Sequence, residues 1–285
     1  MRIFFSATSL LFIALLAVSC DHDKDNDHDG LAGYPMKTGT SWNYDRIILI
    51  DYYESDQSET IIRTDSIPSL VWVDILRDTV LNGQVVKCFG AHDYPATFRS
   101  MEYFFEDAEG LKCMGYQNPG PAVFARKSGF VAGNLFSFKG LSGLVGIAED
   151  DPPIILEDPP TLNIKYPLKK GVQWTYRYPR EGMTLQIDKK AVGEEVLERN
   201  GKLYGCVKIE YLYLYSDVFN GMQITDWIAK EGLVQRISIT DRITLVSNEG
   251  EPMGTIRIRE VSKSSQRSFS YRRSIAPTGN HCLQS

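Results

Sequence analysis

The chain has 285 residues, a formal net charge of −5 and 43% hydrophobic residues. This apolar content is enough for a packed core in one or two domains of ordinary size. The mild acidity, together with the lack of a basic stripe or an RNA-binding motif, argues against a nucleic-acid partner.

Residues 1–19 have the pattern of a secretory signal peptide. Arg2 supplies a positive charge, and the apolar run that follows it is too short for a membrane span. The run leads directly into Cys20, which resembles the lipobox of bacterial lipoproteins, although Ala17 stands where that motif prefers leucine. The resemblance implies that Cys20 becomes the N-terminus and carries acyl chains such as palmitate, which anchor the protein to a membrane. The alternative is an ordinary signal peptide followed by an unrelated cysteine.

Residues 20–33 contain aspartates at every second position from Asp21 to Asp29, opposed only by Lys24. Such a stretch cannot bury apolar surface, so we expect a disordered acidic tether. It is similar to the export signal that some Gram-negative bacteria place after the lipidated cysteine, which implies the outer membrane and the cell surface. The periplasmic face is the alternative, and in other bacteria Asp21 would signal retention at the inner membrane.

Two further features of the sequence bear on metals and catalysis. The tether matches the first half of an EF-hand loop, but the twelfth position is Met36 instead of an acid, so we expect no metal site. Among the four histidines only His92 lies in the body of the chain, and no G-x-S-x-G elbow accompanies it. We therefore predict neither a cofactor nor an enzyme.

An internal repeat is the strongest structural signal. The segment YPMKTGTSWNY at 34–44 returns as YPLKKGVQWTY at 166–176, with six identities in eleven positions where average composition predicts about one. Two further pairs of blocks follow in the same order, NGQVVKCF with NGKLYGCV and FEDAEGL with WIAKEGL. Three ordered blocks predict a duplicated module.

Each block has a structural interpretation. Trp42 with Tyr44, and Trp174 with Tyr176, alternate in the manner of strand residues that share one face. The Asn-Gly pairs at 82–83 and 200–201 predict tight hairpins, and Gly110 and Gly232 follow glutamates in a second kind of turn. In the first module this gives a meander of strands at 85–94, 101–107 and 111–117.

The fold class that follows is all-β, with two tandem antiparallel meander modules, half-barrel-like, that arose by duplication. We expect the first module at 34–148 and the second at 166–263. A proline-rich, extended linker is predicted at 149–165, and a disordered tail at 264–285.

The cysteines do not form a disulfide framework in this interpretation. In the predicted meander, Cys88 and Cys113 lie two strands apart, about 10 Å, which is beyond the reach of a bridge. We therefore expect Cys88, Cys113, Cys206 and Cys282 to be free thiols, with Cys88 and Cys206 in the core.

The pattern Y-P-L-x-x-G-x-x-W-x-Y, a hairpin and then W-x-A-x-x-G-L-V resembles a module of uncharacterised bacterial lipoproteins. The second copy carries the match best, whereas the first has Phe105 in place of the later tryptophan and Lys112 in place of the valine. The resemblance implies a curved antiparallel sheet, like the half-barrels of lipoprotein carriers, and implies no activity.

Three functions are compatible with these features. The first is a non-catalytic binding or structural module, in which Tyr211, Tyr213 and Tyr215 stack on a glycan or a peptide; the alternative is that this tyrosine face packs the core. The second is a lipid or lipopeptide carrier with an apolar cavity. The third is a glycoside hydrolase with two carboxylates, disfavoured because only Glu109 and Glu231 recur and both precede turn glycines.

Overall fold

The structure, a computed structural model, describes residues 30–94, 99–117, 124–126, 129–131, 153–179, 186–214, 222–246 and 252–265. The signal peptide, Cys20 and nearly all of the acidic tether lie outside these ranges. So do Tyr215, Cys282 and the tail beyond residue 265. What the sequence predicts for those residues therefore stays a prediction.

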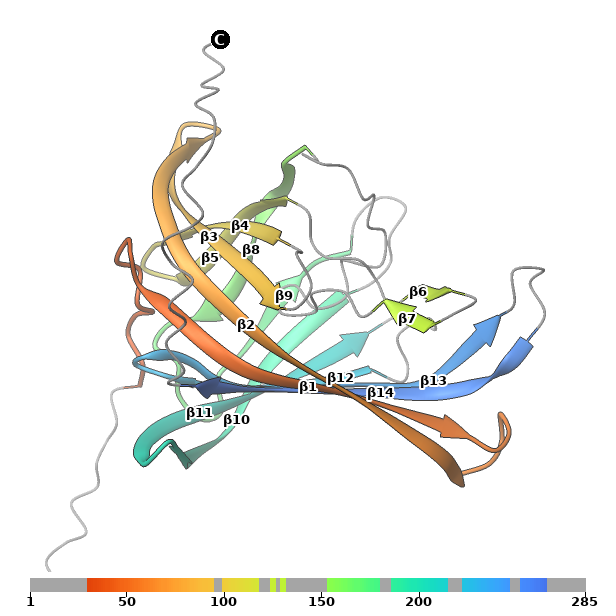
Figure 1. Cartoon of the computed structure of the whole chain (residues 1–285). Helices are drawn as coiled ribbons and strands as arrows, with labels where there is room; N and C mark the ends of the chain where they lie inside the picture. The colour runs from red at the N-terminus through yellow and green to blue at the C-terminus, as the bar shows by residue number, and fades with distance from the viewer. Residues whose placement is uncertain are drawn as a thin grey trace, which may run out of the picture.

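The described residues form an all-β fold, as predicted (Figure 1). The strands are β1 (Ser41–Tyr53), β2 (Ile61–Leu81), β3 (Gln84–Tyr94), β4 (Arg99–Glu106), β5 (Gly110–Gln117), β6 (Phe124–Arg126), β7 (Gly129–Val131), β8 (Ile155–Lys165), β9 (Gln173–Arg177), β10 (Gln186–Arg199), β11 (Lys202–Leu214), β12 (Met222–Ala229), β13 (Gly232–Val246) and β14 (Pro252–Ser265). Strands β6 and β7 form a small separate hairpin. The other strands make one twelve-stranded antiparallel sheet in the order β8-β5-β4-β3-β2-β1-β14-β13-β12-β11-β10-β9.

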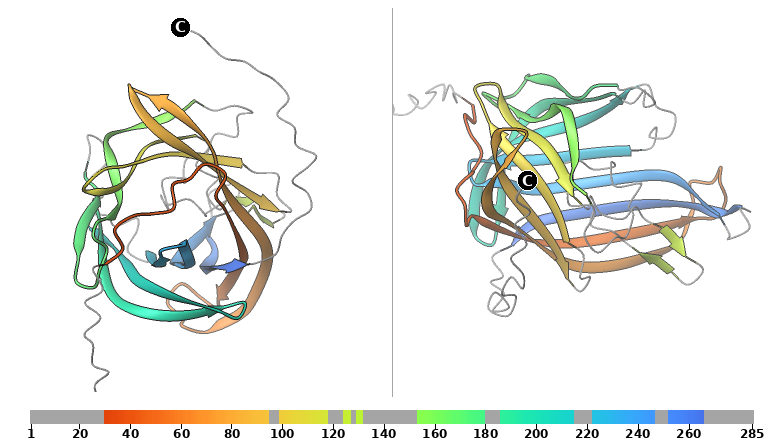
Figure 2. Two further views of the ribbon diagram at one scale, coloured as in Figure 1. Left: turned by 90° about the vertical axis from the view of Figure 1, so that its left-hand side faces the viewer. Right: turned by 90° about the horizontal axis from the view of Figure 1, so that it is seen from above.

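This sheet curls until it is nearly closed into a barrel, so that its two edge strands, β8 and β9, approach each other (Figure 2). The segment before β1 runs across one end of the barrel, as the left view shows. There Leu31 exchanges two backbone hydrogen bonds of 2.9 Å with Leu168, and Tyr34 is buried. This end is therefore covered by the chain itself.

The local signals in the sequence explain the hairpins. Asn82 and Asn200 adopt positive φ values of 48° and 51°, and each is followed by a glycine that also has positive φ. Two such residues in a row make the type of turn whose twist matches a hairpin, so β2–β3 and β10–β11 are joined as predicted. The observed β3, β4 and β5 agree with the predicted meander within two residues at each end.

The predicted linker at 149–165 is corrected by the structure. Ile155–Lys165 is strand β8, which pairs with β5 through Leu111–Ile164 and Cys113–Thr161, among other pairs. The pairing is interrupted opposite Pro159 and Pro160, since the register passes from Gly115–Leu156 directly to Cys113–Thr161. Prolines are tolerated there because β8 is an edge strand.

The two predicted modules share one sheet and one core. Strand β1 of the first pairs with β14 of the second along ten residues. The interior cluster contains side chains from both, including Val73, Phe89 and Phe104 from the first and Trp174 and Ile209 from the second. The concave faces of the two halves therefore pack against each other inside a single barrel.

The described cysteines are free and buried, as predicted. Cys113 belongs to the interior cluster, whereas Cys88 belongs to a smaller cluster with Val86 and Tyr103. Because Cys88 and Cys113 pair with the adjacent residues Tyr103 and Phe104 of β4, they lie on opposite faces of the sheet. Cys206 lies in a second small cluster with Trp227 and Val234.

Candidate functional site

The place where β8 faces β9, which we call the seam, is closed by side chains. Among the described residues no backbone ladder joins the two strands. Instead, Trp174 Nε1 donates to the carbonyl oxygen of Leu162 (2.9 Å), and Lys189 Nζ donates to that of Asn163 (3.0 Å). Arg177 and Glu157 form a buried ion pair of 2.9 Å across the same gap. The barrel is thus weakest in backbone pairing at this seam.

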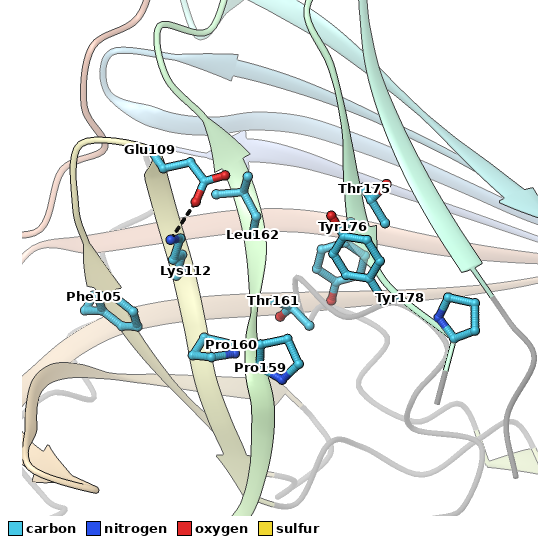
Figure 3. A pocket seen from close by; sticks show the side chains of 11 residues that line it. Phe105, Glu109, Lys112, Pro159, Pro160, Thr161, Leu162, Thr175, Tyr176 and Tyr178 are labelled. Atoms are coloured by element: carbon cyan, nitrogen blue, oxygen red, sulfur yellow. Dashed lines mark ion pairs between the residues drawn. The ribbon is translucent and has the colours of Figure 1, made fainter. Parts of the chain in front are cut away.

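A groove of about 410 Å³ opens along the seam, and we call it the seam groove (Figure 3). Its lining residues come from β4, β5, β8, β9 and the turns beside them. They are Phe105, Glu109, Lys112, Pro159, Pro160, Thr161, Leu162, Thr175, Tyr176, Tyr178 and Pro179. The volume lies within the range of about 300–1,000 Å³ that is usual for ligand pockets.

The walls of the seam groove are mostly rings. Tyr178 follows β9 with 60% of its surface exposed, and Pro159 and Pro160 line the groove from β8 (Figure 3). The one cation in the lining, Lys112, is paired with Glu109 at 2.7 Å and with Asp107 at 2.9 Å. The described lining residues therefore offer flat apolar surfaces and no unpaired positive charge.

Two of the residues that line the groove, Thr161 and Tyr176, carry buried hydroxyl groups. Thr161 projects from β8 toward the rings of Tyr176 and Tyr178 (Figure 3). Thr161 is 4% and Tyr176 is 1% exposed, and neither hydroxyl has a hydrogen-bond partner among the described residues. Burial raises the pKa of Tyr176, so its hydroxyl stays protonated and can both donate and accept a hydrogen bond. A buried polar group without a partner is costly, and such groups gather where a ligand or water completes the site.

Behind Tyr176 lies a set of buried charged and aromatic residues, the interior charge cluster, made of Lys189, Tyr211, Asp226 and Arg236. Asp226 and Arg236 form two charge-assisted hydrogen bonds of 2.6 and 2.7 Å, and the Tyr211 hydroxyl donates to Asp226 at 2.8 Å. Lys189 Nζ lies 4.2 Å from the ring centre of Tyr176 and 4.4 Å from that of Tyr211. Burial lowers the pKa of Lys189 to about 7, against the opposing field of Asp226.

The structure places the tryptophans that recur in the two sequence blocks, Trp42 and Trp174, against the other half of the barrel. Trp42 Nε1 donates to the carbonyl oxygen of Glu231 (2.6 Å), and the Tyr44 hydroxyl donates to that of Leu233 (3.0 Å). Trp174 makes the corresponding bond to Leu162 of β8, and Tyr176 lies in the seam.

The two turn glycines lie at close approaches, Gly110 against the neighbouring strand β8 and Gly232 against Trp42 of β1. A Cβ atom at Gly110 would lie 2.0 Å from the carbonyl oxygen of Ile164, and one at Gly232 would lie 2.7 Å from Trp42 Nε1. Only glycine leaves room for these contacts.

The two described tyrosines of the predicted ladder, Tyr211 and Tyr213, face the barrel interior. Tyr211 is buried with its hydroxyl bonded to Asp226, and Tyr213 packs partly buried against the interior cluster. Tyr215 lies outside the described residues, so the predicted binding role of the ladder stays a prediction. Glu109 and Glu231 lie in turns and pair with Lys112 and Lys202.

Sequence reasoning did not single out Lys189, Asp226 or Thr161. A signal for two of them exists. Lys189 stands between Ile187 and Ala191 in a strand of alternating pattern, so a charged residue occupies an apolar face. Asp226 stands in the same way between two isoleucines of β12. The seam groove itself has no signal in sequence, because it depends on which strands form the sheet edges.

Comparison with protein-family models, with curated proteins and with solved structures finds no match to this chain. Within the described ranges, no three or more histidine, cysteine or acidic side chains are grouped so that they could hold a metal ion. The same ranges contain no helix that is long and apolar enough to cross a membrane.

Proposed function

We propose that this protein is a lipid-anchored component of the bacterial cell envelope whose barrel binds a ligand without catalysis. Cys20 after the apolar run supplies the anchor, and the acidic stretch holds the barrel off the membrane, on the outer cell surface. The single observation that carries the binding function is the seam groove. It joins ring-lined walls to two buried hydroxyls that have no partner among the described residues.

We also propose that the barrel arose by duplication of a six-stranded unit, with β1–β5 and β8 as one half and β9–β14 as the other. Equivalent backbone contacts support this. Gly39 N–H donates to the carbonyl of Ile75 and Gly171 N–H to that of Ala191, both at 2.8 Å, and each contact lies beside a bulge in the following strand. Trp42 and Trp174 each donate to a backbone carbonyl of the opposite half, Trp42 to Glu231 in a turn and Trp174 to Leu162 in β8.

A lipid carrier is supported less well by the described interior. Such a carrier needs an apolar cavity, and a half-barrel would supply one in each module. The apolar interior side chains of both halves instead pack into one shared cluster, with the interior charge cluster beside it. An acyl chain would have to displace buried ion-paired groups, which is costly.

Thermal unfolding of the full-length lipoprotein in detergent tests the binding function. Three probes are the neutral oligosaccharides, the peptides and the lipids extracted from the envelope and medium of a Gram-negative culture. A ligand at a hundredfold excess over its Kd stabilises the folded state by about 2.7 kcal/mol, which raises Tm by roughly 5–10 °C in a protein of this size. We expect one fraction to do so, and the proposal fails if none does.

A further inference from the structure

The seam groove has features that select a class of ligand, and the inference here rests on the binding function proposed above. Its first feature is the ring-bearing side chains in its lining. Tyr178, after β9, is 60% exposed, and Pro159 and Pro160 contribute saturated rings from β8. Flat apolar walls suit a flat ligand with an apolar face, such as the C–H face of a sugar ring.

The second feature is the kind of polar group in the same lining. Thr161 Oγ1 and Tyr176 Oη are each able to donate one hydrogen bond and to accept others. Sugar hydroxyls have the same dual capacity, so one sugar unit can satisfy both groups whichever way each rotates. An acyl chain would leave both hydroxyls unpaired, and a site with unpaired buried polar groups rejects such a ligand.

The third feature is charge. Lys112, the one cation among the described lining residues, is already paired with Glu109 and Asp107, so those residues offer no unpaired cation to a carboxylate, sulfate or phosphate. A neutral ligand therefore fits better than an acidic one.

The fourth feature argues against a peptide added as a strand. Strand addition needs free backbone donors and acceptors along the edge of a sheet. On β8 the prolines at 159 and 160 have no N–H, and the carbonyls of Leu162 and Asn163 already accept bonds from Trp174 and Lys189. The β8 edge therefore has few free backbone donors and acceptors that could bond to a peptide.

We propose that the seam groove binds a short neutral oligosaccharide, with a sugar ring between Tyr178 and the β8 prolines and its hydroxyls bonded to Thr161 and Tyr176. The volume of about 410 Å³ lies at the low end of the range for ligand pockets, which limits the buried part to a short segment.

The test uses the full-length lipoprotein in detergent. An array of neutral oligosaccharides, covering the common hexose, pentose and N-acetylhexosamine linkages, identifies binders, and calorimetric titration then measures Kd. We expect Tyr178→Ala to weaken binding about tenfold or more, because stacking is lost, and Tyr178→Phe to retain it. Tyr204→Ala, which removes a ring on the β10–β11 hairpin, is the matched control and should leave Kd unchanged.

Thr161→Val separates a binding role from a structural one. If Thr161 only fills space, loss of its unpartnered hydroxyl leaves Kd unchanged and does not lower Tm. We expect Kd to rise about fivefold or more while Tm stays the same or increases.

The outcomes distinguish the two proposals. If no oligosaccharide binds but the peptide or lipid fraction raises Tm, the sugar assignment is overturned and the binding function stands. If an oligosaccharide binds equally well to Tyr178→Ala and Thr161→Val, the site is elsewhere and the groove assignment is overturned. If no fraction and no oligosaccharide binds, both proposals fail.

Discussion

Replacing Lys189 with methionine should stabilise the protein, and more so at pH 6 than at pH 9.5. Lys189 is 2% exposed, and burial lowers its pKa from 10.5 to about 7. Between these two values the unfolded chain binds a proton that the folded protein does not, so the wild type gains stability as pH rises through this window. Below pH 7 the folded state bears the full cost of the buried ammonium.

The magnitude follows from the pKa difference. Each pKa unit corresponds to about 1.4 kcal/mol, so the free-energy cost of the buried ammonium is roughly 5 kcal/mol at pH 6 and falls to roughly 1 kcal/mol at pH 9.5. The rings of Tyr176 and Tyr211 favour the ammonium by about 0.5–2 kcal/mol each, which reduces the difference between the two pH values. The advantage of the methionine variant should therefore be about 1–3 kcal/mol larger at pH 6.

Urea unfolding of the full-length protein, followed by circular dichroism, measures the stability difference between Lys189→Met and wild type at each pH. The comparison holds if the slope m is the same for both proteins. Lys190→Met is the matched control, since Lys190 is the next residue of β10 and is exposed. Its stability relative to wild type should not depend on pH. The reasoning is refuted if Lys189→Met shows the same advantage at both pH values, or if it is less stable than wild type at pH 6.

Three further predictions use matched pairs or a single labelled site. Tyr176→Phe should stabilise the unliganded protein by about 1 kcal/mol in urea unfolding, whereas Tyr211→Phe should destabilise it by about 1–3 kcal/mol. The reason is that, in the part of the chain that the structure describes, only the Tyr211 hydroxyl has a hydrogen-bond partner; equal effects would contradict the assignment. Gly110→Ala should cost at least about 3 kcal/mol, because its Cβ would overlap a carbonyl oxygen of β8, whereas Gly193→Ala, with open space around it, should change stability by less than about 1 kcal/mol. Cys20→Ser should abolish metabolic labelling with a palmitate analogue, and labelling that persists in this variant would rule out the predicted anchor.

How far the sequence predicts this fold differs between its parts. The hairpins at Asn82 and Asn200 and the meander of β3, β4 and β5 depend on neighbours in the chain, and they form as predicted. The pairing of β1 with β14 joins residues more than a hundred positions apart, for which alternation gives no register. Strands β8 and β9 are close in sequence, but their approach as the two sheet edges depends on the order of all the other strands. Strand β8 was predicted as a linker because it contains Pro159 and Pro160. Proline is expected in linkers, but it is also tolerated in edge strands.

The candidate site was less predictable than the fold. The repeat identified Tyr176 as a structural aromatic, and the structure adds that its hydroxyl lies buried in the seam without a partner among the described residues. Thr161 and Tyr178 have no pattern that sets them apart from other strand and turn residues. They meet only because the barrel closes at this seam.

Fluorine NMR at the seam groove tests the central claim, that ligand binds at the seam, most directly. The full-length protein would carry trifluoromethyl-phenylalanine in place of Tyr178, and a second sample would carry it in place of Tyr204. Both would be titrated with the neutral oligosaccharide fraction. We predict a saturable change in the resonance at position 178 and none at position 204. A rise in Tm on adding this fraction, without any change in the resonance at position 178, would contradict the claim.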